Sequence, residues 1–526
     1  MDRVYQVLKI RPGESRTAIR FLAFMAVVWT GFAIGGAGVE ALLFARYGPQ
    51  ALPYLYIAVG LVTFLWMTGM TMLLKRRDAD RLLLLMPLAF AAVVLTMRAL
   101  VEVRSNLVYP VLWILMMVMW TAQGLAVWGL AGALHDTRQA KRLFPLYGAG
   151  WILGGVLGGF ATRPIALWIH AENLLFVWAA CLVAAYSIAR TLVRPGAIRP
   201  SRTHRGRPRS RLVGPFKELA VSFRLVRESP LLLWMAVSLG LFALLYFVLT
   251  LVFAEVATAR FPTADRLAGF LGLFMGLSNG IGVLTALFVA NRLFARLGLV
   301  TMVLTMPVIY VAGFAVISFS AAFLAVVIFR LFQVVWVNGI WASAWQGLFN
   351  VVPAERRHRI RTFMDGVPLQ LGIVAAGVLL ILAERVLAPE QVALIGVGAA
   401  ALATLAMWRA RAAYAGAVVE ALQVGNPEVF FYEEEPFGGY RRDAVALSVL
   451  LDGRADPDPA VRRFSMEILV DADAAAADAL ASGLRDPDPG VRIAALRGVA
   501  RTTGVSALPD VVRLLGDPEP VVRAGA

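Results

Sequence analysis

Few residues in this chain could build a disulfide framework or a metal site. One of the 526 residues is a cysteine, Cys181, and the four histidines (His135, His170, His204 and His358) lie far apart. A disulfide needs two cysteines and a metal site needs several clustered ligands, so neither is predicted. No Walker loop, nucleophile elbow or convincing pair of catalytic acids is found. We therefore expect no metal, no cofactor and no enzymatic activity.

Charged residues are scarce as well, at 16% of the chain, whereas 60% of the residues are hydrophobic and the mean hydropathy is +0.73. The net charge of +16 would suggest nucleic-acid binding in a soluble protein. Here the basic residues lie in short loops beside long apolar runs, where they orient helices and meet anionic lipid headgroups. The expected partner is therefore a lipid bilayer and not a nucleic acid.

Twelve apolar segments can be counted, each of a length that crosses a bilayer core of roughly 30 Å. The first is longer than a signal-peptide core of about 7–15 residues, so we expect a membrane helix there. The sequence thus predicts an all-α, polytopic membrane protein. The approximate limits of the segments are 20–45, 51–74, 82–103, 107–133, 144–169, 172–193, 230–257, 267–290, 297–318, 321–350, 362–385 and 390–411.

Basic residues follow the even-numbered segments, while the opposite loops are short and poor in charge. Cytoplasmic loops are rich in Lys and Arg, so this pattern predicts that both chain ends are cytoplasmic. The alternation would collapse if a segment were missing, and it therefore supports twelve. The basic exits include Lys75 after segment two, Arg138, Lys141 and Arg142 after segment four, Arg292 after segment eight, and Arg356, Arg357, Arg359 and Arg361 after segment ten.

A stretch rich in proline and basic residues divides the membrane part into six plus six segments. The two halves look related, because a basic residue precedes a glycine at the same spacing in each. Arg138 and Arg356 lie 218 positions apart (356 − 138), and so do Gly148 and Gly366 (366 − 148). This plan fits a major-facilitator-like bundle. The expected domains are membrane halves at 1–194 and 230–413, a flexible basic linker at 195–229 that lies against lipid headgroups, a connector at 414–440 and a soluble tail at 441–526.

The tail contains a short repeat. Asp456-Pro-Asp-Pro-Ala-Val-Arg462, Asp486-Pro-Asp-Pro-Gly-Val-Arg492 and Asp517-Pro-Glu-Pro-Val-Val-Arg523 align, with spacings of 30 (486 − 456) and 31 (517 − 486) residues. Asp caps a helix start, Pro fits the first helical position, and the following Val faces a core. This resembles a HEAT-type α-solenoid. Because the sequence stops just inside a repeat, we expect a fragment, or an array that leans on the membrane domain or on another partner.

Glycines recur every four residues in segments five (Gly150, Gly154, Gly158) and eight (Gly272, Gly276, Gly280). Small residues at this spacing let another helix backbone approach closely. They indicate either plain helix packing or a sliding contact between the two halves of a carrier, and the two interpretations are compatible.

Five charged residues, Glu40, Arg98, Arg163, Glu255 and Arg330, lie within apolar segments. A charge costs about 2.5–3.5 kcal/mol at mid-bilayer on insertion scales, so each should have a partner or a wet cavity. One interpretation is structural ion pairing, such as Glu40 with Arg98. The other is a central cavity where arginines, above all Arg163 and Arg330, bind an anionic solute.

Segment ten adds amide side chains, Gln333 and Asn338 among them, between three tryptophans. Such groups could line a polar path through the bundle. They could equally form the interhelical hydrogen bonds that are ordinary in membrane bundles.

Two motifs at the basic loops carry a family resemblance. Arg138-Gln-Ala-Lys141-Arg142-Leu-Phe-Pro-Leu-Tyr-Gly148 resembles the E-A-K-R-F-Y-P-L-F-G stretch of the nucleotide transporter (ATP/ADP translocase) family. Arg357-x-Arg359-x-Arg361-x-x-x-Asp365 is similar to its K-x-K-x-K-x-x-x-D pattern. The resemblance covers about residues 1–413. It implies a major-facilitator-like fold in a bacterial inner membrane and a nucleotide or phosphorylated anion as solute. These loop residues would act at the cytoplasmic gate, and HEAT-fused bacterial members fit the tail.

Three functions follow as hypotheses. The first is a secondary transporter of an organic anion that works by alternating access, with a tail that regulates it or binds a cytoplasmic protein. The second is a lipid flippase of the same architecture. The third is a membrane scaffold or receptor whose HEAT array recruits a partner, since such arrays offer extended binding surfaces.

Overall fold

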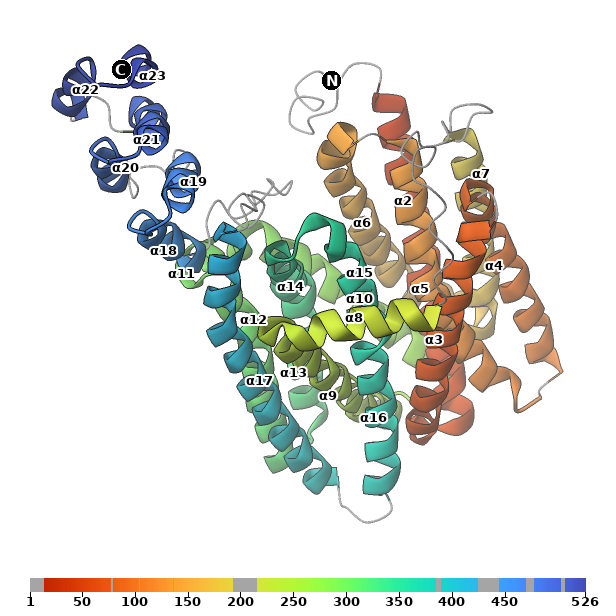
Figure 1. The fold of residues 1–526 in the computed structure, drawn as a ribbon. Helices are drawn as coiled ribbons and strands as arrows, with labels where there is room; N and C mark the ends of the chain where they lie inside the picture. Colours follow the sequence, from red (N-terminus) through yellow and green to blue (C-terminus); the bar gives the residue numbers. More distant parts are fainter. Residues whose placement is uncertain are drawn as a thin grey trace.

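The structure is a computed structural model that describes residues 14–76, 79–103, 105–135, 137–192, 215–384, 389–423, 444–469, 477–502 and 507–526. Within these ranges the chain is helical and has no strand. Two helix bundles form the membrane part, and a smaller helical array is attached to the second bundle (Figure 1). The fold is therefore the all-α bundle and solenoid that the sequence predicts.

The first bundle holds six membrane helices. Helix α2 lies at its centre and packs mainly on α6 and α7, with its glycines at the contacts. The helices are α2 (Ser15–Tyr47), α3 (Leu52–Arg76), α4 (Ala79–Glu102), α5 (Val108–Leu134), α6 (Thr137–Ile169) and α7 (Leu174–Leu192), joined in part by the short η1 (Pro49–Ala51) and η2 (Ala171–Asn173).

The second bundle repeats this plan, with two membrane spans interrupted by π-helical turns. Span eight runs from α10 (Ala264–Thr285) through η4 (Ala286–Ala290) to α11 (Asn291–Leu297), and span ten runs through α13 (Phe323–Trp336), η5 (Val337–Trp341), α14 (Ala342–Gly347) and η6 (Leu348–Val351). The other helices are α9 (Pro230–Arg260), α12 (Leu299–Phe319), α15 (Ala354–Gly366), α16 (Pro368–Glu384) and α17 (Pro389–Gln423). The two π-helical turns contact each other.

Twelve helical stretches in the described part are long and apolar enough to cross a membrane, one for each segment expected. Large apolar side chains lie on their outer surfaces, such as Trp168 and Phe319, which are 83% and 91% exposed. Such contiguous apolar surface suits contact with lipid, and the helices satisfy their own backbone hydrogen bonds. The chain is thus a multi-pass membrane protein.

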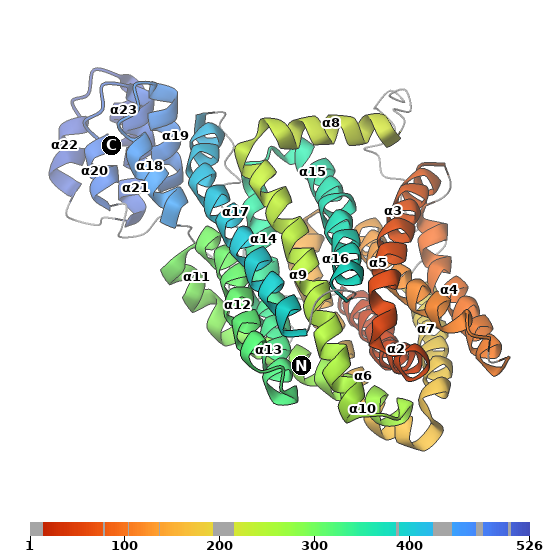
Figure 2. The ribbon, with the colours of Figure 1, turned by 90° about the horizontal axis from the view of Figure 1, so that it is seen from below.

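Two of the expected connecting segments contain helix in the structure. The linker was expected to be flexible throughout, but residues 215–228 form an amphipathic helix, α8 (Pro215–Glu228), which lies across the ends of the second bundle (Figure 2). Its buried side chains, Ser222 and Val226, recur at helical spacing. Helix α17 continues to Gln423 and so extends into the expected connector. Residues 195–214 of the expected linker and 424–440 of the expected connector lie outside the described residues.

In the described part of the chain, the two bundles approach each other most closely through glycines. We call the end with the basic loops after the even-numbered spans the basic end, and the end with Gly48, His170 and Phe261 the opposite end. Near the opposite end, Gly159 of α6 lies against the backbone of Gly276 in α10, and Gly377 of α16 lies against Pro53 of α3.

Toward the basic end the glycines have open space instead. A Cβ on Gly148 of α6 or on Gly280 of α10 would meet no atom within 4 Å. Among the described residues, the bundles are therefore in contact at Gly159 and Gly377 and leave open space at Gly148 and Gly280.

Some of the repeated glycines pack helices within one bundle, and others lie at the contact between the two bundles. Gly150, Gly154 and Gly158 lie against the α2 backbone, so they pack helices within the first bundle. Gly272 and Gly276 lie against α6 and so belong to the contact between the bundles, whereas Gly280 does not.

The Gly159 contact leads to a prediction. We expect Gly159→Ala to lower the thermal stability of the purified protein by about 1–3 kcal/mol, because its Cβ must displace the α10 backbone. The matched variant Gly280→Ala adds the same methyl group in open space, and alanine is favoured over glycine in a helix by roughly 1 kcal/mol. Thermal unfolding in detergent compares the two variants. Equal melting temperatures would show that the bundles do not meet at Gly159.

The tail is a stack of short helix pairs beside the basic end of α17 (Figure 1). Val461, Val491 and Val522 are buried, as expected for the residue that follows each Asp-Pro turn. In each helix pair, the helix that carries the buried valine begins at the second proline of its repeat, and the described tail has six helices. They are α18 (Ala444–Gly453), α19 (Pro459–Leu469), α20 (Ala477–Gly483), α21 (Pro489–Thr502), α22 (Leu508–Leu514) and α23 (Pro520–Gly525).

Arginine and aspartate tie one repeat to the next. Arg462 donates through Nε and Nη2 to the carboxylate of Asp486 at 2.8 and 3.0 Å, and through Nη1 to the Asp456 carbonyl at 2.9 Å. Arg492 donates through Nη2 to the carboxylate of Asp517 at 2.9 Å and through Nη1 to the carbonyl of Asp486 at 2.8 Å. Burial acts to raise the pKa of Asp486, but the bonds from Arg462 and from the Asp488 amide outweigh it, so this pKa is lowered. The repeats are therefore linked by charge as well as by the valine core.

The contacts of Arg462 with Asp486 and of Arg492 with Asp517 form an aspartate–arginine ladder along the tail. This ladder predicts that two neighbouring arginines, Arg462 and Arg463, differ in their contribution to stability. Arg462→Ala should raise hydrogen exchange in α19 and α20–α21 by a local destabilisation of about 1.5–3 kcal/mol, because it removes charge-assisted hydrogen bonds to Asp486. Arg463 forms an exposed i,i+4 pair with Glu467, so Arg463→Ala should change exchange by less than about 0.5 kcal/mol. Similar exchange in both variants would contradict the ladder.

Candidate functional site

Arg330 is a buried charge inside the second bundle. It lies on α13, is 7% exposed, and has its guanidinium carbon 4.3 Å from the centre of the Tyr246 ring on α9. Its Nη1 donates to Oε1 of Gln333, one turn further along α13, at 2.9 Å. A cation–π contact and a hydrogen bond therefore hold the side chain in place.

The first bundle brings an acid to Arg330. Glu40 lies on α2, in the part of the chain nearer the opposite end, and interacts electrostatically with Arg330 across the boundary between the bundles. Tyr56 of α3 also crosses this boundary, since its ring packs 4.7 Å from that of Phe247 on α9. Tyr56 is fully buried within electrostatic range of Glu40, Arg330 and Glu255. We call Glu40, Tyr56, Tyr246, Glu255, Arg330 and Gln333 the central cluster.

Several buried side-chain atoms in and beside the central cluster lack a hydrogen-bond partner. Among the described residues, the buried hydroxyl of Tyr56 and the buried Nε2 of Gln333 make no hydrogen bond. The Tyr310 hydroxyl lies beside Gln333 but also lacks a well-formed bond. A buried polar group without a partner costs about 1–3 kcal/mol, so these three donors mark a place for water or a bound solute.

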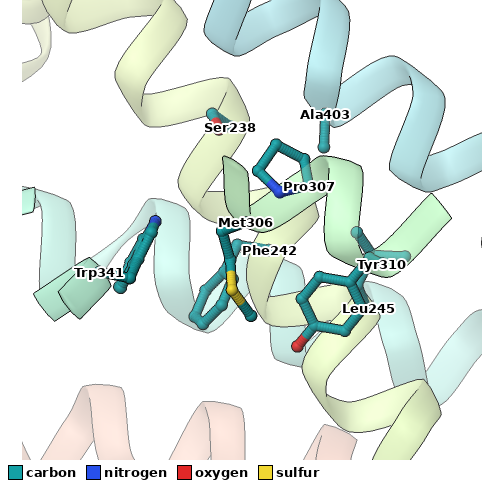
Figure 3. A pocket seen from close by; sticks show the side chains of 8 residues that line it. All are labelled: Ser238, Phe242, Leu245, Met306, Pro307, Tyr310, Trp341 and Ala403. Carbon is teal, nitrogen blue, oxygen red and sulfur yellow. The ribbon is translucent and has the colours of Figure 1, made fainter. Parts of the chain in front are cut away.

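A small pocket lies beside the cluster within the second bundle (Figure 3). Phe242, Met306, Tyr310 and Trp341 form much of its wall, and Phe242 stacks on Trp341 with ring centres 4.5 Å apart. The pocket has room for about one water molecule and not for an organic solute. It therefore adjoins the cluster without being the solute site.

The expected intramembrane charges divide into two groups. Glu40, Glu255, Arg330 and Gln333 come together in the central cluster, but Arg98 does not pair with Glu40. Arg98 donates instead to Glu102 at 2.6 Å and to Asn173 at 2.7 Å, which fixes α4 to the start of α7. The expected alternative of a Glu40–Arg98 pair is therefore wrong, because Arg98 already has a partner on its own helix.

Two other candidates lie apart from the cluster contacts. Arg163 is exposed, and its side chain packs against Gly269 of α10 at the contact between the bundles. Asn338 is exposed on η5 beside Gly282 of α10. Arg163 and Asn338 therefore lie against α10, and neither makes the ring contact or the hydrogen bond that holds the buried Arg330.

The basic loop before span eleven is built around the end of span ten. Arg357 donates to the carbonyls of Phe349 and Val352 at 3.1 and 3.0 Å, and Arg361 donates to the Gln346 carbonyl at 3.1 Å. Cations at a helix C-terminus satisfy carbonyls that the helix leaves unpaired. These arginines therefore have a structural task at the expected gate.

The remaining gate candidates have less defined surroundings. Arg359 and Asp365 are exposed on α15. The side chains of Arg138, Lys141 and Arg142 at the start of α6 lie outside the described residues. The matching motif in the first bundle is therefore placed by its backbone alone.

At the opposite end, one histidine links the bundles. His170 Nδ1 lies 3.0 Å from Asp265 Oδ2 at the start of α10, and the Ala171 amide donates to Asp265 Oδ1 at 2.7 Å. His170 adopts a positive φ of 67°, unusual for a residue with a side chain. The hydrogen bond to Asp265 and the charge of that carboxylate raise the pKa of His170 above its ordinary 6.5.

This pKa shift predicts a pH-dependent closure. Protonated His170 favours the paired state, so its stabilisation is complete below about pH 6.5 and is lost as the pH rises through the raised value. In a Cys181→Ala background, spin labels at Val103→Cys and Phe319→Cys should move apart as the pH is raised from about 6 to 9. His170→Gln should remove this change, and His135→Gln, which alters a histidine on Tyr147 near the basic end, should preserve it. A pH response that survives in His170→Gln would contradict the assignment.

The sequence pattern did not single out the tyrosines of the central cluster. Tyr56 and Tyr246 lie in apolar runs where an aromatic residue is ordinary, and only the meeting of α3, α9 and α13 gives them a role. A usable signal was present nonetheless, because Arg330 and Gln333 lie three residues apart and so share one helix face.

Sequence comparison gives two partial matches. Residues 447–526 match the family of HEAT repeats. The chain is also 22% identical over 223 residues to ADP,ATP carrier protein 1 of Chlamydia muridarum (strain MoPn / Nigg), a match that covers 39% of this chain and 40% of that protein. The chain thus spans about two fifths of the length of this carrier.

The fold resembles that of solved transporters. A mutant form of the nucleoside transporter NupG superposes with a TM-score of 0.55 at 13% identity, covering 75% of this chain and 98% of that one. A bacterial homologue of the iron transporter ferroportin, in its inward-facing state, superposes with a TM-score of 0.52 at 18% identity and the same coverage. At these identities the likeness defines the fold alone. The chain therefore has a major-facilitator transporter-like fold with a HEAT-repeat tail.

Proposed function

We propose that this protein is a secondary transporter of an organic anion, such as a nucleotide or another phosphorylated metabolite, and not an enzyme. The observation that carries the proposal is Arg330, a charge buried inside the second bundle within electrostatic range of Glu40 and Tyr56 of the first. Ionisable groups in such positions usually serve a solute or ion pathway. Solute sites of these folds lie near mid-membrane at the interface of the repeats.

The unpartnered donors support an anion as the solute. Arg330, the Tyr56 hydroxyl and the Gln333 amide all offer hydrogens, and oxygen atoms of a phosphate or carboxylate would accept them. The partial match to an ADP,ATP carrier favours a phosphorylated solute in particular.

We place the protein in a bacterial inner membrane with the basic end and both termini in the cytoplasm, from the positive-inside rule. The opposite end, where the bundles meet, then faces outward, and the conformation is open to the cytoplasm. Rocking of the bundles about the α6–α10 contact would expose Arg330 to the other side. The HEAT tail beside α17 would lie in the cytoplasm, where it could bind a protein partner or regulate transport.

A direct test is counterflow of labelled ATP, ADP and glucose 6-phosphate in liposomes that contain the purified protein. Arg330→Ala should lower the rate by roughly 30-fold or more, since loss of one partner of a buried charge pair costs about 2–5 kcal/mol. Arg163→Ala removes an exposed arginine outside the cluster contacts and should have a much smaller effect.

Absence of counterflow for every probe, with the melting temperature of the protein intact, would remove the transport proposal. The scaffold or receptor would then be the stronger reading, because the HEAT repeats offer a binding surface independently of transport.

A further inference from the structure

The further inference concerns a group of tryptophans in the first bundle, and it rests on the proposed function. Trp29 of α2 and Trp151 of α6 stack, with ring centres 3.9 Å apart and planes 12° apart. Trp120 of α5 stands at a steep angle to both rings, with its ring centre 4.6 Å from that of Trp29 and 5.8 Å from that of Trp151. Trp29 is buried, whereas Trp120 is 39% exposed. Its neighbours therefore hold the Trp120 indole in place and leave part of it uncovered.

The face of α5 that carries Trp120 follows the boundary between the bundles. Trp113 precedes Trp120 by seven positions (120 − 113) and so shares this face. It is buried with its ring centre 6.1 Å from that of Tyr56, and the Tyr56 ring lies 4.7 Å from Phe247 of the second bundle. Toward the basic end, a Cβ on Gly124 would meet no atom within 4 Å. The face is thus closed at Trp113, partly covered at Trp120 and open at Gly124.

Helix α6 gives the same position for Trp151. Gly155, four positions further along the chain (155 − 151), lies against Asn279 of α10 in the second bundle. Gly148, three positions earlier (151 − 148), has open space instead. Two helices therefore place Trp120 and Trp151 where the bundles begin to separate, and the solute sites of such folds lie at the interface of the two halves.

An amide side chain lies at the corresponding place in the second bundle. Asn338 follows Trp120 by 218 positions (338 − 120), which is also the offset between Gly148 and Gly366 (366 − 148). Asn338 is exposed on the π-helical turn η5, and such turns are frequent at functional sites. Its amide offers two donor hydrogens and a carbonyl acceptor, which suit the polar edge of a heteroaromatic ring.

We propose that Trp120 stacks on a flat heteroaromatic ring of the solute and that Asn338 binds the edge of this ring. The two residues then determine specificity, because they favour anions that carry such a ring over sugar phosphates. A tryptophan held by its neighbours loses little side-chain freedom on binding. Stacking of a base on an aromatic side chain changes affinity by roughly 5- to 150-fold.

The experiment compares ring-bearing and ring-free anions in the same liposomes. Counterflow is measured at several concentrations of labelled ATP and of glucose 6-phosphate, with the full-length protein. The ratio of the two half-saturating concentrations does not depend on the amount of active protein. We expect the wild type to prefer ATP and Trp120→Leu to reduce this preference by roughly 5-fold or more, with glucose 6-phosphate unaffected.

Two further variants at tryptophans serve as matched controls. Trp120→Phe keeps an aromatic face and should retain most of the preference for ATP. Trp168→Leu makes the same change as Trp120→Leu at an exposed tryptophan near the opposite end of α6, and it should leave the preference unchanged.

Asn338→Ala gives a second test that does not disturb the packing of the tryptophans. Its side chain is exposed, so its loss leaves no buried cavity. We expect the half-saturating concentration of ATP to rise by roughly 2- to 10-fold and that of glucose 6-phosphate to stay the same. If Trp120→Leu does not fold, this result supports the proposal, and an equal change for both probes overturns it.

The remaining outcomes separate this inference from the proposed function. Equal half-saturating concentrations for both probes in the wild type overturn the inference and leave anion transport in place. The same holds if Trp120→Leu keeps the wild-type preference, or if it weakens both probes equally, because Trp120 then has a packing role alone. Absence of transport of every probe by the folded wild type overturns the proposed function, and this inference with it.

Discussion

A single buried arginine constrains the rest of this membrane bundle. Arg330 is kept inside an apolar assembly, and a charge there must be held by polar or charged neighbours. Tyr246 and Gln333 provide them from the second bundle, and Glu40 of the first bundle lies within electrostatic range. The cluster lies at the boundary between the bundles, so any relative movement of the bundles changes the surroundings of the arginine. A solute that binds there would be sensed by both halves.

The contacts around this boundary allow such a movement. At one end the bundles approach through glycine, with Gly159 against Gly276 and no side chain between them, and His170 joins Asp265 by a hydrogen bond on the surface. At the basic end Gly148 and Gly280 face open space. Small residues let the helices of the two bundles approach closely, and the rings of Tyr56 and Phe247 also pack across the boundary. The aspartate–arginine ladder of the tail is different, because it links successive repeats through largely buried side chains.

The sequence allowed most of the fold to be predicted and less of the site. The twelve apolar runs, the basic loops after Lys75 and Arg138 and the spacing of the Asp-Pro repeats each depend on local composition, which hydropathy and periodicity report directly. The amphipathic helix α8 was missed because proline and basic residues surround it. The partners of the charges could not be predicted, since pairing depends on which helix faces which. Arg98 has a partner four residues along its own helix, and Glu40 is within electrostatic range of an arginine almost three hundred positions away (330 − 40 = 290).

The most direct test of this account is a double-mutant cycle between the two halves. The free energy of unfolding of the purified protein in detergent would be measured for the wild type, Glu40→Gln, Arg330→Gln and the double variant. Residues in one charge network usually show a coupling energy of about 0.5–3 kcal/mol. A favourable coupling in that range is the result expected if Glu40 and Arg330 attract each other across the boundary. Additive effects, with a coupling indistinguishable from zero, would contradict the central cluster and the transport scheme built on it.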